Sequence, residues 1–142
     1  MKKQECTFWV YTIQKVSKEL DMQEICKSTF TCPVEATIQL IGGKYKAVIL
    51  WHLMNDTLRY NELHKRVPRA TDKMLAQQLR ELERDGLINR TVYPVVPPKT
   101  EYSLTDFGKT LVPILDEMCK WGNGYLEENT SLECQSVCSD NN

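Results

Sequence analysis

The stretch that decides the fold is TDKMLAQQLRELERDG, residues 71–86. Thr71 is a favoured N-cap residue and Gly86 a favoured helix stop, so the stretch predicts a helix that runs to Arg84. One side of this helix gathers Met74, Leu75, Gln78, Leu79 and Leu82. The opposite side gathers Lys73, Gln77, Arg80 and Arg84, with Ala76 at its edge and no acid at its centre. A merely solvated helix usually mixes charges of both signs, so the pattern favours a recognition surface over plain solvation.

A stiff β-loop follows this helix. Residues 87–93 and 100–104 have the composition of two strands of a hairpin. Pro94, Pro97 and Pro98 stiffen the loop between them, which also carries Lys99. A helix with a polar outer face, followed by a proline-stiffened finger, is typical of proteins that present both to a DNA duplex.

Three helices are predicted before residue 71. The first begins after Thr31 or Cys32, with Pro33 at its first position, and stops at Gly42-Gly43. The second covers about residues 44–54 and is apolar around most of its circumference, which predicts the buried centre of the domain. The third is short, from about residue 59 to residue 66, and Pro68 forces a turn after it.

A last helix is predicted from its cap at Thr105. Apolar residues follow at spacings of three and four: Phe107, Leu111, Ile114, Leu115, Met118, Trp121 and Tyr125. Pro113 lies inside this pattern and should kink or split the helix. Past Glu127 the composition becomes polar and small, which predicts a mobile tail.

The length and charge of the chain limit its class. Its 142 residues fit one domain, and no stretch approaches the roughly 20 apolar residues that span a bilayer. Residues 41–110 carry twelve Lys or Arg against eight Asp or Glu, whereas residues 111–142 carry one against six. A basic middle suits contact with phosphates, although a solvated charged surface would look the same. We expect a cytoplasmic protein, because Glu5, Gln14 and Lys15 interrupt any secretory signal.

The first 30 residues show no long-lived period. Lys18-Glu19 can be encoded by a purine-rich sequence of the kind that binds ribosomes, shortly before Met22. We therefore hypothesise that translation begins at Met22 in the cell and that residues 1–21 are not translated. An intact mass that includes residues 1–21 would contradict this hypothesis.

Several motifs resemble one known family. They are Cys32-Pro33, Gly42-Gly43-Lys44, Lys73-Met74-Leu75 with residues 77–82, Val96-Pro97-Pro98 and residues 102–105. Together they resemble the HxlR-type family of bacterial winged helix-turn-helix (MarR-like) transcriptional regulators, over nearly two thirds of the chain. The resemblance implies an α+β, mainly α, winged helix-turn-helix DNA-binding domain with N- and C-terminal dimerisation helices. It also implies that the protein is a homodimer and that each subunit places one helix in the major groove and one wing on the adjacent backbone.

The domain and interface residues follow from that resemblance. We expect an N-terminal extension at 1–31, a winged-helix domain at 32–126 that includes the C-terminal dimerisation helix, and a tail at 127–142. The apolar stripe of the last helix then supplies the dimer interface, and its residues are Leu111, Leu115, Met118, Trp121 and Tyr125.

The side chains predicted to contact DNA divide into two kinds. Lys73 and Gln77 lie toward the start of the exposed helix face and suit base edges, Gln77 with adenine in particular. Arg80 suits a guanine edge or a phosphate, and Thr71 at the helix start suits a phosphate. Arg90 and Lys99 on the wing are expected at phosphates or in the minor groove, and Arg84 at a phosphate or in solvent.

Cys32 is the candidate redox sensor among six cysteines. It stands at a helix start, where unpaired N–H groups and the helix dipole stabilise a thiolate. The resemblance implies sensing of electrophiles or disulfide stress, and a small packed capping residue is an equal alternative. Cys119 suits a buried structural position, and Cys134 and Cys138 suit resolving thiols. A metal site at these last two is disfavoured because no histidine lies nearby.

Two other functions remain open beside a redox-sensing regulator. One is a winged-helix regulator switched by a small aromatic or lipophilic effector near Trp51 and Trp121. The other is a module that contacts only proteins. An enzyme is disfavoured, since the sequence contains no catalytic constellation, and we expect no metal or other cofactor. His52 fits a core or interface position and His64 a basic surface. The partners expected are double-stranded operator DNA, a second copy of the chain and an oxidant or small-molecule inducer.

Overall fold

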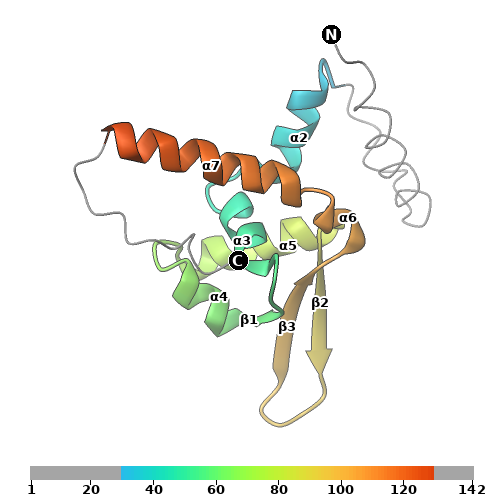
Figure 1. Cartoon of the computed structure of the whole chain (residues 1–142). Coiled ribbons are helices and arrows are strands. Elements are labelled where there is room, and N and C mark those ends of the chain that lie inside the picture. Colours follow the sequence, from blue (N-terminus) through green and yellow to red (C-terminus); the bar gives the residue numbers. More distant parts are fainter. Residues whose placement is uncertain (1–29, 130–142) are drawn as a thin grey trace. The chain divides into compact units, whose positions relative to one another are not determined.

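The computed structural model describes residues 30–129 (Figure 1). These residues belong to two units, and the boundary along the chain lies between Thr110 and Leu111. The elements of the first unit are, in order, α2 (Pro33–Ile41), α3 (Lys46–Leu53), β1 (Leu58–Arg59), α4 (Tyr60–Arg66), α5 (Asp72–Arg84), β2 (Ile88–Tyr93), β3 (Lys99–Leu104) and α6 (Asp106–Lys109). The second unit contains α7 (Val112–Asn129).

The predicted start and stop of the first helix are confirmed, whereas the second helix differs slightly from its predicted bounds. Pro33 is the first residue of α2, where its missing N–H costs nothing, and Gly42 is the C-cap. The next helix, α3, starts at Lys46, two residues later than predicted, and ends at Leu53. Its residues Ile49 and Leu50 are fully buried, but Val48 is 41% exposed, so α3 is not buried around its whole circumference.

Leucine and isoleucine side chains from α3, α4 and α5 build the core of the first unit. The side chains with essentially no exposed area are Ile49, Leu50, Leu63, Leu75, Leu79, Leu82 and Leu87. Burial of each such side chain stabilises the fold by about 1.5–3 kcal/mol relative to an exposed position. The buried row of α5 is therefore what fixes which face of that helix is left to solvent.

Helices α4 and α5 form the helix-turn-helix. The hydroxyl of Thr71 caps α5, as predicted, by accepting a hydrogen bond from the backbone N–H of Met74 at 3.3 Å. Gly86 ends the helical segment with a φ of 73°, a conformation that costs glycine little and other residues more. The chain thereby turns directly from α5 into β2.

The sheet has three antiparallel strands in the order β1-β3-β2. Strands β2 and β3 form the predicted hairpin, with Ile88 opposite Leu104 and Tyr93 opposite Lys99. Strand β1 was not predicted. It is two residues long, and it exists because Leu58 and Arg59 pair with Tyr102 and Glu101 of β3. In Figure 1 the hairpin extends beyond the helices of the first unit.

Thr105 links the end of α5 to the start of α6. Its hydroxyl donates to the carbonyl of Gly86 at 2.6 Å and accepts from the N–H of Gly108 at 2.8 Å, which caps α6.

The predicted final helix is split at Thr110 and Leu111, and Pro113 falls in the first turn of α7, where proline is tolerated. Helix α7 reaches Asn129, so residues 127–129 of the predicted tail are helical.

None of the helices in the described part of the chain is long and apolar enough to cross a membrane.

Candidate nucleic-acid interface

Helix α5 turns a polar face to solvent. Its buried row is Leu75, Leu79 and Leu82, and the side chains on the far side are exposed: Lys73, Gln77, Arg80 and Arg84. Gln78 belongs to the inner side, since its carbonyl oxygen is buried and has no hydrogen-bond partner among residues 30–129. The structure therefore confirms which side of this helix is presented, and it distinguishes Gln77 from its neighbour as the outward amide.

Three cations, two on the exposed face of α5 and one on the hairpin, are unpaired within the described residues. Lys73, Arg80 and Arg90 make no ion pair and no side-chain hydrogen bond there, whereas Nε of Arg84 lies 3.2 Å from Oδ1 of Asp85. An unpaired exposed cation keeps its full charge for a phosphate or a base edge. Arg84 has part of its charge already balanced.

A recess brings Arg80 and Arg90 together. It has a volume of about 340 Å³ and lies where α5 meets the hairpin. The residues that line it are Ala76, Leu79, Arg80, Glu83, Arg90 and Tyr102. Two guanidinium groups from different elements, both unpaired within residues 30–129, thus border one recess, and Glu83 is the acid in its described lining. Such a pair suits a phosphate at the junction of helix and wing.

Lys99 is engaged within the hairpin. Its ammonium pairs with the carboxylate of Glu101 and lies 4.8 Å from the centroid of the Tyr93 ring. These contacts leave its side chain 31% exposed. The hydrogen bond from Lys99 holds the pKa of Glu101 below its usual range, so this carboxylate is charged at neutral pH. Lys99 therefore reaches the surface with its charge largely balanced.

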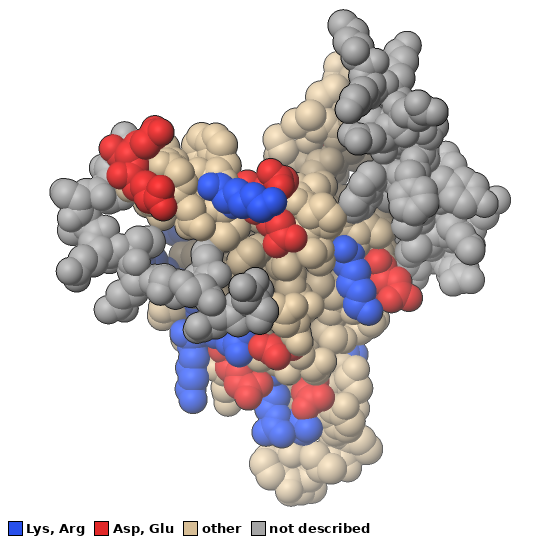
Figure 2. Space-filling model, in the orientation of Figure 1, with Lys and Arg blue, Asp and Glu red and all other residues tan. Residues whose placement is uncertain are grey.

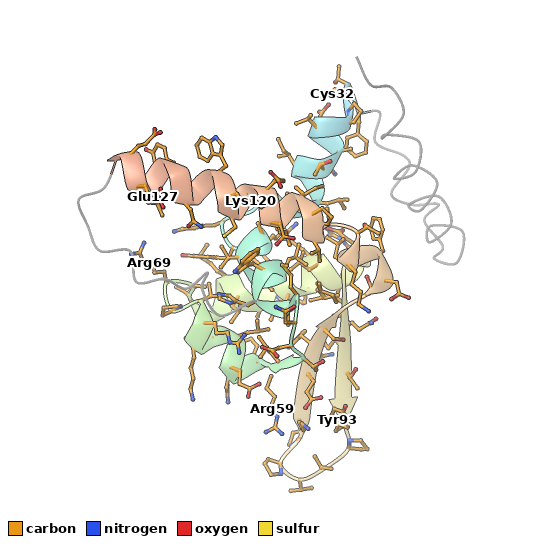
Figure 3. The ribbon with its side chains drawn as sticks, in the orientation of Figure 1. Cys32, Arg59, Arg69, Tyr93, Lys120 and Glu127 are labelled. Atoms are coloured by element: carbon orange, nitrogen blue, oxygen red, sulfur yellow. The ribbon has the colours of Figure 1, made fainter. Side chains whose placement is uncertain are left out.

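Two further basic residues border this surface and were not predicted to contact DNA. Arg59 precedes α4 and lies 3.7 Å from the same Glu101 carboxylate, and Figure 3 shows it near Tyr93 at the hairpin. Arg69 lies in the turn before α5, with its carbonyl accepting from the hydroxyl of Tyr45 at 2.8 Å. On the face drawn in Figure 2, Lys and Arg side chains lie over α4 and along the hairpin, with Asp and Glu between them. The basic residues just before Thr71 were the signal that could have identified Arg69.

The start of α5 carries its own polar cluster. The hydroxyl of Tyr60 donates to the carboxylate of Asp72 at 3.2 Å, and Nε2 of His64 lies 3.4 Å from the same oxygen. The Thr71 hydroxyl accepts from the helix and keeps its own hydrogen for a further bond. Thr71 thus retains the donor that a phosphate contact requires, and His64 faces Asp72 rather than a basic patch.

Cys32 is exposed at the outer end of α2 (Figure 3). It is the N-cap residue, and its thiol makes no capping hydrogen bond. Glu35 in the first turn accepts instead from the backbone N–H of Thr31 at 2.8 Å, and this bond lowers the pKa of its carboxyl. The exposed thiol is open to an oxidant, and it stands at the helix start, as predicted. The predicted resolving thiols Cys134 and Cys138, with Cys6, Cys26 and Met22, lie outside the described residues.

The five residues predicted for the dimer interface fall into two groups in the second unit. Leu111 and Leu115 are buried, whereas Met118, Trp121 and Tyr125 are exposed, Trp121 by 72%. The rings of Trp121 and Tyr125 stack, with centroids 5.5 Å apart. Cys119 is half-buried on the same helix, and its sulfur accepts a hydrogen bond from Asn123 at 3.8 Å. No group of three potential metal ligands occurs in residues 30–129.

Comparison with known proteins identifies the family. Residues 40–130 match the protein-family model described as HxlR-like helix-turn-helix. The uncharacterized HTH-type transcriptional regulator YdeP of Bacillus subtilis (strain 168) is 50% identical over 109 residues, which cover 77% of this chain and 85% of that protein. The uncharacterized HTH-type transcriptional regulator YtcD of the same organism is 52% identical over 118 residues, which cover 80% of this chain and 94% of that protein.

A solved structure supports the same assignment. The redox regulator HypR in its oxidized form matches with a TM-score of 0.64 and 48% sequence identity, over 71% of this chain and all of that one. The expected winged helix-turn-helix fold and the expected family are thereby confirmed. This chain belongs to the HxlR-like helix-turn-helix family of transcriptional regulators.

Proposed function

We propose that this helix-turn-helix transcriptional regulator binds operator DNA as a homodimer, with α5 in the major groove and the β2–β3 hairpin on the neighbouring backbone. One observation carries the proposal: the exposed face of α5 presents Lys73 and Arg80, with Arg90 beside Arg80 on the hairpin, and none of the three has an ion pair among residues 30–129. A helix with free cations next to a β-finger matches the charge and width of a DNA groove and its flanking phosphates. The proposal implies that the protein acts in the bacterial cytoplasm, where the chromosome lies.

The proposed roles follow the position of each side chain. Lys73 and Gln77 face outward in the first half of α5 and would meet base edges. Arg80 and Arg90 would hold a phosphate at their common recess, and Thr71 would donate its hydroxyl hydrogen to another. Lys99 would add a weaker phosphate contact, because its positive charge is already paired with the carboxylate of Glu101.

The first experiment measures binding of the full-length protein to a duplex from its own upstream region by fluorescence anisotropy. Gln77→Ala should lose about 1–3 kcal/mol of binding free energy on that duplex, the usual contribution of a bidentate base contact. Glu127→Gln, on α7, is the control and should bind like wild type. Equal binding by Gln77→Ala and wild type would remove Gln77 from the base-reading role.

We further propose that oxidation of Cys32 controls this binding. Two observations support it: the Cys32 thiol is exposed and uncapped at the start of α2, and HypR, at 48% identity, is named a redox regulator. A peroxide would convert the thiolate to a sulfenic acid with release of hydroxide, and a second thiol would then displace the sulfenic oxygen as water to form a disulfide.

The same anisotropy titration, repeated after mild peroxide treatment, tests this step. Affinity should change in wild type and in Cys119→Ser, the control, but not in Cys32→Ser. Tight binding that does not respond to oxidation in any of the three would contradict sensing by Cys32. The alternative of a small aromatic or lipophilic effector would then be pursued.

A further inference from the structure

A polar ladder runs along α5 and its C-cap through Gln77, Glu81 and Asp85, which are spaced four residues apart. Nε2 of Gln77 donates to Oε1 of Glu81 at 3.1 Å. The other oxygen of Glu81 lies 2.9 Å from Nζ of Lys46 on α3, and Oδ2 of Asp85 lies 3.8 Å from the same ammonium. The outward amide of α5 is thus tied, through one carboxylate, to a neighbouring helix.

Lys46 makes this tie rigid. It is 4% exposed, and it is the buried charged side chain of residues 30–129. A buried ammonium requires a charged partner, so Glu81 is held beside Lys46 instead of moving freely in solvent. The hydrogen bond from Lys46, and then that from Gln77, lower the pKa of Glu81, which keeps this carboxyl ionised at neutral pH.

The ionised carboxylate determines how the Gln77 amide is turned. A carboxylate only accepts hydrogen bonds, so the amide must direct its NH₂ group toward Glu81 and its carbonyl oxygen away from it. The reversed amide would bring two acceptor oxygens together without a hydrogen between them. Gln77 therefore offers its carbonyl oxygen and its one remaining N–H to a ligand on the exposed face of α5.

We propose that Glu81 is a positioning residue that sets the base preference of Gln77 to adenine. In the major groove, adenine presents an N6–H donor beside the N7 acceptor, which match a free carbonyl oxygen and one N–H. Guanine and thymine present only acceptors there and leave the carbonyl oxygen without a donor. This inference rests on the proposed function, since it assigns the specificity of the same surface.

The test measures base discrimination and not only affinity. Anisotropy competition with the full-length protein uses the upstream duplex and a set of duplexes in which each base pair is changed in turn. The base pair at which Gln77→Ala loses discrimination is the pair that Gln77 reads. At that pair wild type should prefer adenine at least about fivefold over guanine or thymine.

Glu81→Gln should reduce that preference to less than about twofold and leave the discrimination at the other base pairs unchanged, because a neutral amide can either donate to Gln77 or accept from it. In a Gln77→Ala background, Glu81→Gln should cause no further loss at this pair. Glu127→Gln removes one negative charge on α7 and should keep the full preference. If Glu81→Gln fails to fold, Lys46→Met/Glu81→Gln removes the buried cation together with its partner and serves in its place.

The outcomes separate this inference from the proposed function. Absence of salt-dependent DNA binding by wild type would defeat both. Normal binding in which Glu81→Gln keeps the adenine preference, or weakens every duplex equally, would overturn the inference alone. So would a wild-type preference for guanine or thymine at the pair that Gln77 reads.

Discussion

At the residue scale, His52 gives the protein a predicted pH response. Burial on α3, followed by the positive charge of Arg66, lowers the pKa of His52 below its ordinary value of 6.5. The unfolded chain therefore binds this proton more tightly than the folded one. The contribution of neutral His52 to stability is fully present above pH 6.5 and is lost as the pH falls through its lower folded pKa.

Thermal unfolding followed by circular dichroism checks this response. The unfolding midpoint of wild type should fall as the pH is lowered from about 7.5 to about 5, and the fall should be smaller in His52→Gln. His64, the other histidine, is present in both proteins and therefore does not account for a difference between them. Identical pH profiles for the two proteins would show that His52 does not contribute.

Single residues also show where prediction from sequence ends. Helical periodicity was enough to place Gln77 outward and Leu79 inward on α5, because both follow from the geometry of one helix. The burial of Lys46 could not be predicted. Lysine is rarely buried, and here it is buried only because Glu81 and Asp85 approach it from another helix. For the same reason, the sequence did not predict the connection from Gln77 through Glu81 to Lys46 on α3.

At the element scale, the hairpin contains a matched pair of basic residues, one free and one engaged. Arg90 on β2 has no ion pair among residues 30–129, whereas Lys99 on β3 is paired with Glu101. Each phosphate neutralised by a cation adds about 0.9 to the slope of log affinity against log salt concentration. A cation whose charge is already balanced releases fewer counterions.

Salt titrations of DNA binding distinguish the two residues. Arg90→Ala should lower the slope by about 1 on every duplex, and Lys99→Ala should lower it by less than half as much. Anisotropy at several salt concentrations on the upstream duplex and on an unrelated duplex measures both. A larger effect of Lys99→Ala than of Arg90→Ala would mean that the pair with Glu101 opens on DNA.

Elements differed in how well the sequence predicted them. Helix α5 was predicted with its cap and its end, and Pro113 predicted the break before α7, because those signals are local. Strand β1 has no local signal. Two residues acquire strand geometry only by pairing with β3, about 40 residues later in the sequence, and periodicity cannot detect a contact of that range.

At the scale of the whole molecule, both units expose apolar side chains. Val34 and Ile38 on α2 are more than half exposed, and Met118, Trp121 and Tyr125 are exposed on α7. Exposed aromatic and aliphatic side chains grouped on one helix indicate an interaction surface more strongly than isolated ones do. The proposed homodimer would cover the exposed apolar side chains of α7 and place two copies of α5 on one duplex.

Trp121 is the residue whose loss should weaken that dimer most, because a large exposed aromatic side chain is the usual centre of an interface. Trp121→Ala should cost about 2 kcal/mol or more of dimerisation free energy, which raises the dimer Kd about 30-fold. Lys120→Ala is the matched control: Lys120 is its neighbour on α7, its side chain is also 72% exposed, and its ion pair within residues 30–129 is a surface pair with Glu117. Sedimentation velocity over a range of concentrations measures both. An unchanged Kd in Trp121→Ala would move the interface away from this side of α7, and Val34→Ala on α2 would be examined next.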